Sequence, residues 1–173
     1  MKKLSPVVLM PLSPWDLPIM SKKKGIGLME KSANAGNKTA ASNMSLAYKK
    51  GDGVETNIEK SIEWAIKAAK LGDDDTIFQY AVAYFDGEDP VTEDKAKAVE
   101  FFVLAANAGS STAMENLGVC YNNGYGVALD KNKAIEWFEK AAKEGGFKKA
   151  MDNLEDLYPE VDASTSQTSI LNW

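Results

Sequence analysis

Apolar residues recur at steps of three and four along Asp130–Gly145, which is the spacing of one face of an α-helix. Asp130 can cap the first turn, and Gly145 can adopt the left-handed conformation that ends a helix. The same arrangement occurs three more times, at Ser21–Gly36 (the faintest copy), Asn57–Gly72 and Asp94–Gly109. The copies start 36, 37 and 36 residues apart, which predicts a repeat protein.

A second helix pattern precedes three of these copies. These first helices of the repeats are predicted at 38–49, 74–85 and 111–122, and each is followed by a glycine-containing turn. Tyr48, Tyr84 and Tyr121 occupy one column of the alignment. Two short antiparallel helices cannot bury their faces alone, so we expect stacked hairpins with a continuous core. The prediction is an all-α solenoid of helical hairpins with about eight helices.

The repeat spacing also divides the chain. Residues 1–20 are apolar but interrupted by Pro6, Pro11, Pro14 and Pro18, and are expected to form an extended strap. The solenoid is expected over 21–158, followed by a flexible, Ser/Thr-rich tail at 159–173. Its parts are a half-repeat at 21–36, repeats at 36–71, 72–108 and 109–145, and a terminal helix at 147–158.

The repeated positions resemble a known family. First-helix alanine and tyrosine, a G-x-G-V turn, an Asp or Asn cap, and then Lys-Ala-Ile-Glu-Trp-Phe and Ala-Ala-x-x-Gly are similar to Sel1-like repeats, which are related to tetratricopeptide repeats. The resemblance covers 21–158 and is weakest in the half-repeat and at the EDPV turn. It implies a right-handed superhelix that acts as an adaptor or binding scaffold. A secreted branch with paired cysteines is disfavoured, because this chain has only Cys120.

Aromatic residues of the second helices are interpreted as core. Trp64, Phe101 and Trp137 share one column, opposed by pairs of small alanines. We expect Trp137→Ala to cost about 3–5 kcal/mol of stability.

The resemblance places the first helices on a concave groove. The residues expected to face a partner there are Leu46, Lys49, Phe78, Val82, Phe85, Glu115, Val119 and Asn122. Phe78, Val82 and Phe85 lie at i, i+4 and i+7, so they form an apolar stripe opposite the expected core face of Ile77, Ala81 and Tyr84. A docked protein or peptide, the chain's own strap or C-terminal tip, or a second copy in a homodimer are the alternatives for covering this stripe.

Composition narrows the function classes. The net charge of −5 disfavours binding to nucleic acid and to anionic membranes. Because no apolar run is long enough to span a bilayer and there is one cysteine, we also expect no membrane span and a cytoplasmic location. The absence of histidine removes Ser-His and Cys-His nucleophiles and the usual zinc sets, and Cys120 occupies a column of alanines. We therefore expect no catalytic residue, metal or cofactor.

The leading hypothesis is a non-enzymatic protein-interaction module, an adaptor or regulator. The resemblance leaves two alternatives open: an immunity protein that caps a toxin, and a hydrolase, for which a nucleophile and base are missing from the sequence.

Overall fold

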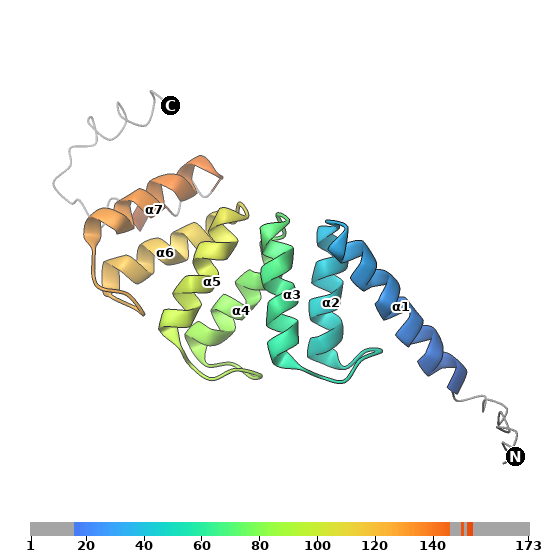
Figure 1. The fold of residues 1–173 in the computed structure, drawn as a ribbon. Helices are drawn as coiled ribbons and strands as arrows, with labels where there is room; N and C mark the ends of the chain where they lie inside the picture. Colours follow the sequence, from blue (N-terminus) through green and yellow to red (C-terminus); the bar gives the residue numbers. More distant parts are fainter. Residues whose placement is uncertain (1–15, 146–149, 151, 154–173) are drawn as a thin grey trace, which may run out of the picture.

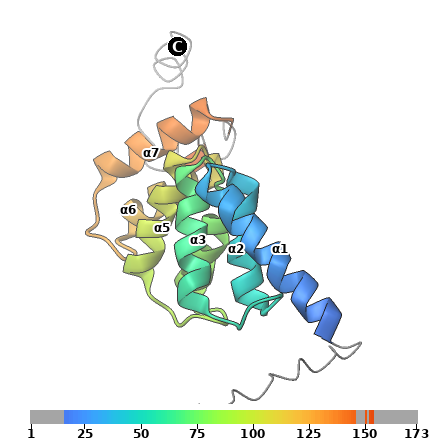
Figure 2. The same ribbon diagram turned by 45° about the vertical axis from the view of Figure 1, so that its right-hand side comes forward.

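A computed structural model describes residues 16–145, 150, 152 and 153 of the chain. In these residues there are seven helices and no strand: α1 (Asp16–Asn34), α2 (Lys38–Lys50), α3 (Ile58–Lys70), α4 (Asp75–Asp86), α5 (Lys95–Asn107), α6 (Ser111–Asn123) and α7 (Lys131–Lys143). The helices form one elongated row from α1 at one end to α7 at the other (Figures 1 and 2). The prediction of an all-α repeat solenoid is confirmed.

The row is built from antiparallel hairpins. The first helices α2, α4 and α6 pack on the second helices α3, α5 and α7 of the same repeats, and each hairpin packs on the next through α3–α4 and α5–α6. The second helices α3 and α5 also touch directly. Both contribute small buried alanines, such as Ala69 and Ala105, to the same core. The half-repeat contributes α1, which packs on α2.

The N-terminal boundary differs from the prediction. An extended strap was expected through residue 20, but α1 begins at Asp16, so residues 16–20 are helical. Pro18 does not prevent this, because proline in a first turn lacks only an N–H that has no partner there in any case. Residues 1–15 and 159–173 lie outside the described residues. Within the expected terminal helix, only residues 150, 152 and 153 are described, and they are helical.

The helix ends follow the predicted chemistry. The second helices begin at side-chain caps, with Asn57, Asp94 and Asp130 accepting hydrogen bonds from the N–H groups three residues on, at 2.9, 3.0 and 3.1 Å. The first helices end at Gly51, Gly87 and Gly124, whose φ angles are 74°, 72° and 73°. These positive angles are accessible to glycine at little cost.

The aromatic column of the second helices is only partly in the core, because Phe101 is 4% exposed but the two tryptophans are not buried. Trp64 and Trp137 are only half-buried, and Lys67 and Lys140 lie over their rings, 4.8 and 4.1 Å from the ring centres. Phe138 is 1% exposed, and its ring lies where Gly118 of α6 has no side chain. We therefore expect a larger loss of stability at Phe138 than at Trp137, and a smaller loss at Trp137 than the about 3–5 kcal/mol expected from the sequence.

A buried polar seam joins the first two hairpins. The Ser61 hydroxyl donates to the carbonyl oxygen of Ser45 at 2.5 Å, and the Tyr80 hydroxyl donates to Ser61 Oγ at 2.7 Å. The seam therefore connects α2, α3 and α4. Burial raises the pKa of Tyr80 above its usual value of 10.0, although its hydrogen bond to Ser61 acts in the opposite direction.

Candidate partner-binding surface

The α4 face consists of Phe78, Val82 and Phe85, the stripe singled out in the sequence. All three side chains are half-buried. The rings of Phe78 and Phe85 lie 5.8 and 6.2 Å from the ring of Phe102, which projects from α5 and is 2% exposed. The sequence predicted a stripe on the side of α4 opposite the core. In the structure the stripe instead contacts the core, because Phe102 of the same hairpin packs beneath it.

Phe102 is the physical reason for this difference. The equivalent position of the first repeat holds Ala65, and that of the third holds Phe138, which turns toward Gly118. In the second repeat, Phe78 and Phe85 flank Phe102, so one side of each ring contributes to the interior. The remaining surface of the stripe stays accessible. The predicted core face of α4, with Ile77, Ala81 and Tyr84, is buried as expected.

Leu46 and Val119 extend the α4 face to the neighbouring first helices. They occupy the position of Val82 in α2 and α6; Leu46 is 45% exposed and Val119 is half-buried. Successive first helices thus carry Leu46, Val82 and Val119 in one row. Such a row of accessible apolar side chains is a feature of surfaces that bind other proteins.

The predicted polar positions divide into three cases. Lys49 is exposed, and its Nζ lies 5.4 Å from the ring centre of Tyr80. Asn122 is half-buried. Glu115 was expected to face a partner but is 6% exposed, so its carboxylate belongs to the interior and is not available at the surface.

An aromatic contact next to the α4 face was missed by the sequence reasoning. Tyr125, in the turn between α6 and α7, packs edge-on against Phe85 with ring centres 5.8 Å apart. Lys95 Nζ lies 5.4 Å from the Phe85 ring and 5.3 Å from the Tyr125 ring. Tyr125 remains 40% exposed, so this cluster borders the α4 face with a further accessible ring. The only indication of this contact in the sequence is that Tyr125 occupies the position that holds Asp52 in the first repeat.

The tyrosine column has a structural role. In each repeat a lysine of the second helix lies over the ring of the first-helix tyrosine, in the pairs Lys60–Tyr48, Lys97–Tyr84 and Lys133–Tyr121, at 5.4, 4.5 and 5.4 Å from the ring centre. Such cation–π contacts stabilise the hairpin by about 0.5–1 kcal/mol at exposed sites. The column therefore needs no ligand to explain it.

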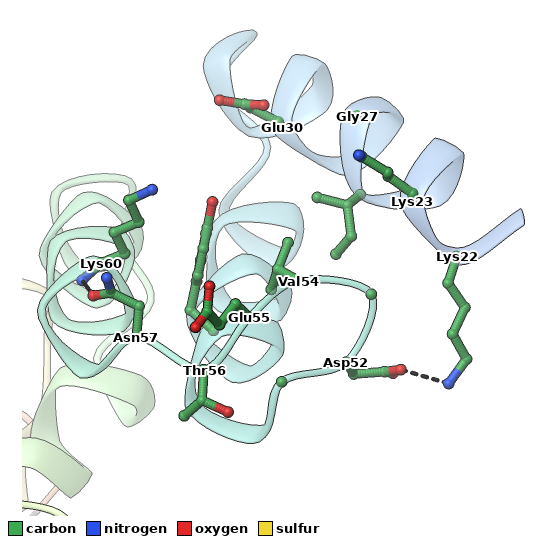
Figure 3. A pocket seen from close by; sticks show the side chains of 14 residues that line it. Lys22, Lys23, Gly27, Glu30, Asp52, Val54, Glu55, Thr56, Asn57 and Lys60 are labelled. Atoms are coloured by element: carbon green, nitrogen blue, oxygen red, sulfur yellow. Dashed lines mark hydrogen bonds and ion pairs between the residues drawn. The ribbon is translucent and has the colours of Figure 1, made fainter. Parts of the chain in front are cut away.

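A cleft of about 930 Å³ opens between α1 and the turn that joins α2 to α3 (Figure 3). Ile26, Val54 and Tyr48 contribute apolar surface to it. Figure 3 shows Lys23 on the α1 wall and Lys60 on the α3 side, with Glu55 between them; Lys22 is paired with Asp52 at 2.7 Å.

The cleft follows from departures of α1 from the repeat. Gly27 stands where the later second helices have Glu63 and Glu100, and Glu30 replaces a half-buried aliphatic residue such as Val103. Because the lining charges are mixed, three lysines against Glu30, Asp52 and Glu55, the cleft offers no dominant charge to a ligand.

The described residues offer little for catalysis. Burial raises the pKa of the Cys120 thiol to about 11, so the nucleophilic thiolate is scarce at neutral pH. No group of three or more potential ligands in the described part of the chain is placed to hold a metal. Among the helices described, none combines the length and apolar character needed to cross a bilayer.

Comparisons with known proteins agree with this architecture. The Sel1 repeat profile matches residues 21–37, 39–73, 76–110 and 111–146. A Sel1 repeat protein from Oxalobacter formigenes is 33% identical, with 77% of this chain and 98% of that chain covered and a TM-score of 0.59. A search of curated protein sequences gave no match.

Two further solved structures are similar. A protective antigen of uropathogenic Escherichia coli with an SLR fold is 28% identical over 77% of this chain and 28% of that chain, with a TM-score of 0.56. Helicobacter pylori cysteine rich protein B is 22% identical over 78% and 95% of the two chains, with a TM-score of 0.51, which is a likeness of fold. Since the repeat profile covers most of the sequence, and the Oxalobacter protein aligns over nearly its whole length, the chain belongs to the Sel1 repeat family.

Proposed function

We propose that the chain is a non-enzymatic protein-interaction module that binds a protein or peptide segment on the α4 face and its extensions at Leu46 and Val119. Sel1 repeat proteins are generally protein-interaction modules. The observation that carries the proposal is the accessible apolar row on three successive first helices, with Leu46 45% exposed. Apolar and aromatic side chains of this kind supply most of the binding energy in protein interfaces.

The rest of the predicted set has smaller roles in this proposal. Lys49 and Asn122 border the row as polar residues, while Glu115 is buried and is not part of the proposed contact. Phe78 and Phe85 present one side of each ring and are supported from below by Phe102. A surface that is already packed from beneath loses little side-chain entropy when a partner binds.

The test is a display library of proteome fragments from the source organism. Bound fragments are compared between the wild type and Leu46→Glu/Val82→Thr, which adds polarity to the row without removing volume from the core. Leu28→Glu is the matched control, because Leu28 is 61% exposed on α1, away from the α4 face. We expect the double variant to lose fragments that Leu28→Glu retains.

Equal capture by the wild type and the double variant, at equal helix content, would show that the row is not the binding surface. A toxin inhibitor would use the same surface with a different partner, so the identity of the captured fragments distinguishes that alternative from an adaptor. Dimerisation through the row would appear instead as a mass change on dilution that Leu46→Glu/Val82→Thr removes.

A further inference from the structure

The charges of the chain are segregated along the solenoid. Residues 22–72 hold ten lysines and five carboxylates, whereas 73–94 hold eight carboxylates and no lysine or arginine. The acidic stretch coincides with α4 and the turns on either side of it. The apolar α4 face therefore lies in the most acidic part of the chain.

Of these eight carboxylates, only one forms an ion pair among the described residues, and two others accept hydrogen bonds. Asp73 accepts a hydrogen bond from the Ser42 hydroxyl at 2.6 Å, Glu93 pairs with Lys95 at 3.3 Å, and Asp94 caps α5. The other five have neither an ion pair nor a side-chain hydrogen bond among the described residues: Asp74, Asp75, Asp86, Glu88 and Asp89. All but Asp74 are exposed.

Two of the free carboxylates lie at the two ends of the α4 face. Asp75 precedes Phe78 by three residues, and Asp86 follows Val82 by four, so both share the helix side of the stripe. At 1.5 Å per residue, they are separated by about 16 Å along the helix axis. The neighbouring first helices carry Thr39 and Lys50, or Thr112 and Asn123, at these positions, so the acidic ends belong to α4 alone.

Two cations border the same region and do not cancel its charge. Lys49 lies over the Tyr80 ring on the α2 side, and Lys95 lies between Phe85 and Tyr125, where it is already paired with Glu93. The charge left for a partner to neutralise is negative.

From this arrangement, and resting on the proposed function, we infer that the partner segment of the α4 face is cationic and amphipathic. Its apolar side chains contact Phe78, Val82 and Leu46, and its Lys or Arg side chains reach Asp75 at one end and Asp86 at the other. Opposite charges at the rim of an apolar contact favour encounter with the correct partner and suppress acidic competitors.

The probe is a random 12-residue peptide library displayed on phage and selected on the full chain. We expect enrichment of peptides with Lys or Arg on both sides of apolar residues. The best sequence is then synthesised, and its Kd is measured by fluorescence anisotropy at low and high salt. Because exposed ion pairs are weak and screened, we expect Asp75→Asn/Asp86→Asn to raise Kd roughly three- to tenfold at low salt and less at high salt.

Glu59→Gln/Glu63→Gln is the control, because it removes the same charge from exposed positions on α3. It should leave Kd within about twofold, which excludes a general attraction of basic peptides to an acidic protein.

The outcomes separate this inference from the proposed function. Enriched peptides that are neutral or acidic, and whose binding falls with Leu46→Glu/Val82→Thr but not with Asp75→Asn/Asp86→Asn, overturn the inference and leave the α4 face as the binding surface. Peptides indifferent to both double variants, or a library that yields no binder, count against both.

Discussion

Gly118 and Phe138 provide a sharp test of how the third hairpin is packed. A Cβ atom at Gly118 would lie 2.4 to 2.7 Å from three ring carbons of Phe138, far inside the ordinary contact distance of about 3.5–4.0 Å. The ring is 1% exposed and has little room to move away. Overpacking of this kind costs about 1–3 kcal/mol. Alanine is favoured over glycine within a helix by about 1 kcal/mol, which offsets part of that cost.

Gly118→Ala should therefore destabilise the wild type by about 1 kcal/mol, a net of the two effects. In a Phe138→Ala background the clash is absent, so the same substitution should stabilise by about 1 kcal/mol. The change of sign corresponds to a coupling of about 2 kcal/mol between the two positions, within the range found for residues in contact. Urea unfolding followed by circular dichroism at 222 nm measures all four corners of the cycle.

Gly25→Ala is the matched control, because Gly25 is also within a helix but nothing lies within 4 Å of a Cβ placed there. It should be neutral or stabilising in both backgrounds. If Gly118→Ala stabilises the wild type as much as Gly25→Ala does, the ring is not confined by α6 and the reasoning is wrong. If Phe138→Ala does not fold, Phe138→Leu gives the same comparison with a smaller amplitude.

Three further predictions follow from burial and hydrogen bonding. Ser61→Ala should cost about 1–3 kcal/mol, because it leaves the buried Tyr80 hydroxyl without its acceptor, whereas Tyr80→Phe should cost about 0.5–1.5 kcal/mol; urea titrations that rank them in the opposite order would contradict the seam. Phe138→Ala should lower stability by about 3–5 kcal/mol and Trp137→Ala by clearly less, and equal losses in thermal melts would argue against the burial difference. The folded-state pKa of Cys120, about 11 against an ordinary 9.0, means that stability present below pH 9 is lost as pH rises to 11, by about 2–3 kcal/mol. Cys120→Ala should remove this part of the loss when the free energy of unfolding is measured by urea titration at pH 8.5 and at pH 11. If the variant loses as much stability between the two pH values as the wild type does, burial does not raise the pKa of the thiol.

The fold was predictable because each hairpin repeats the same local sequence signals for helix starts, helix ends and buried faces. Caps at Asn57, Asp94 and Asp130, glycines at the ends of the first helices, and apolar steps of three and four are all decided within a few residues of sequence. The exception is the start of α1, where four prolines suggested an extended segment. Only Pro18 falls within the described helix, and it lies in the first turn, where proline is tolerated.

The position of the candidate surface was predictable from the sequence, but the burial of its side chains was not. Helical spacing placed Phe78, Val82 and Phe85 on one side of α4, whereas their partial burial depends on Phe102, a residue of the following helix. The contact of Tyr125 with Phe85 joins two different repeats, and helical periodicity carries no information about a turn residue. Glu115 shows the same limit. It occupies the repeat position of Phe78, and its charge did not indicate that this side chain turns toward the interior.

The seam of Ser45, Ser61 and Tyr80 has a consequence for the geometry of the surface above it. Alanine faces can slide over one another at little cost, but hydrogen bonds are directional and are satisfied at only one angle between the hairpins. Since the seam ties α2 and α3 to α4, it fixes the separation between Leu46 and Val82 before any partner arrives. If the two hairpins met only through apolar side chains, the separation could vary from molecule to molecule. A partner would then bind only the fraction of molecules with the correct arrangement. Three small polar groups in the interior thus keep the surface in a single register.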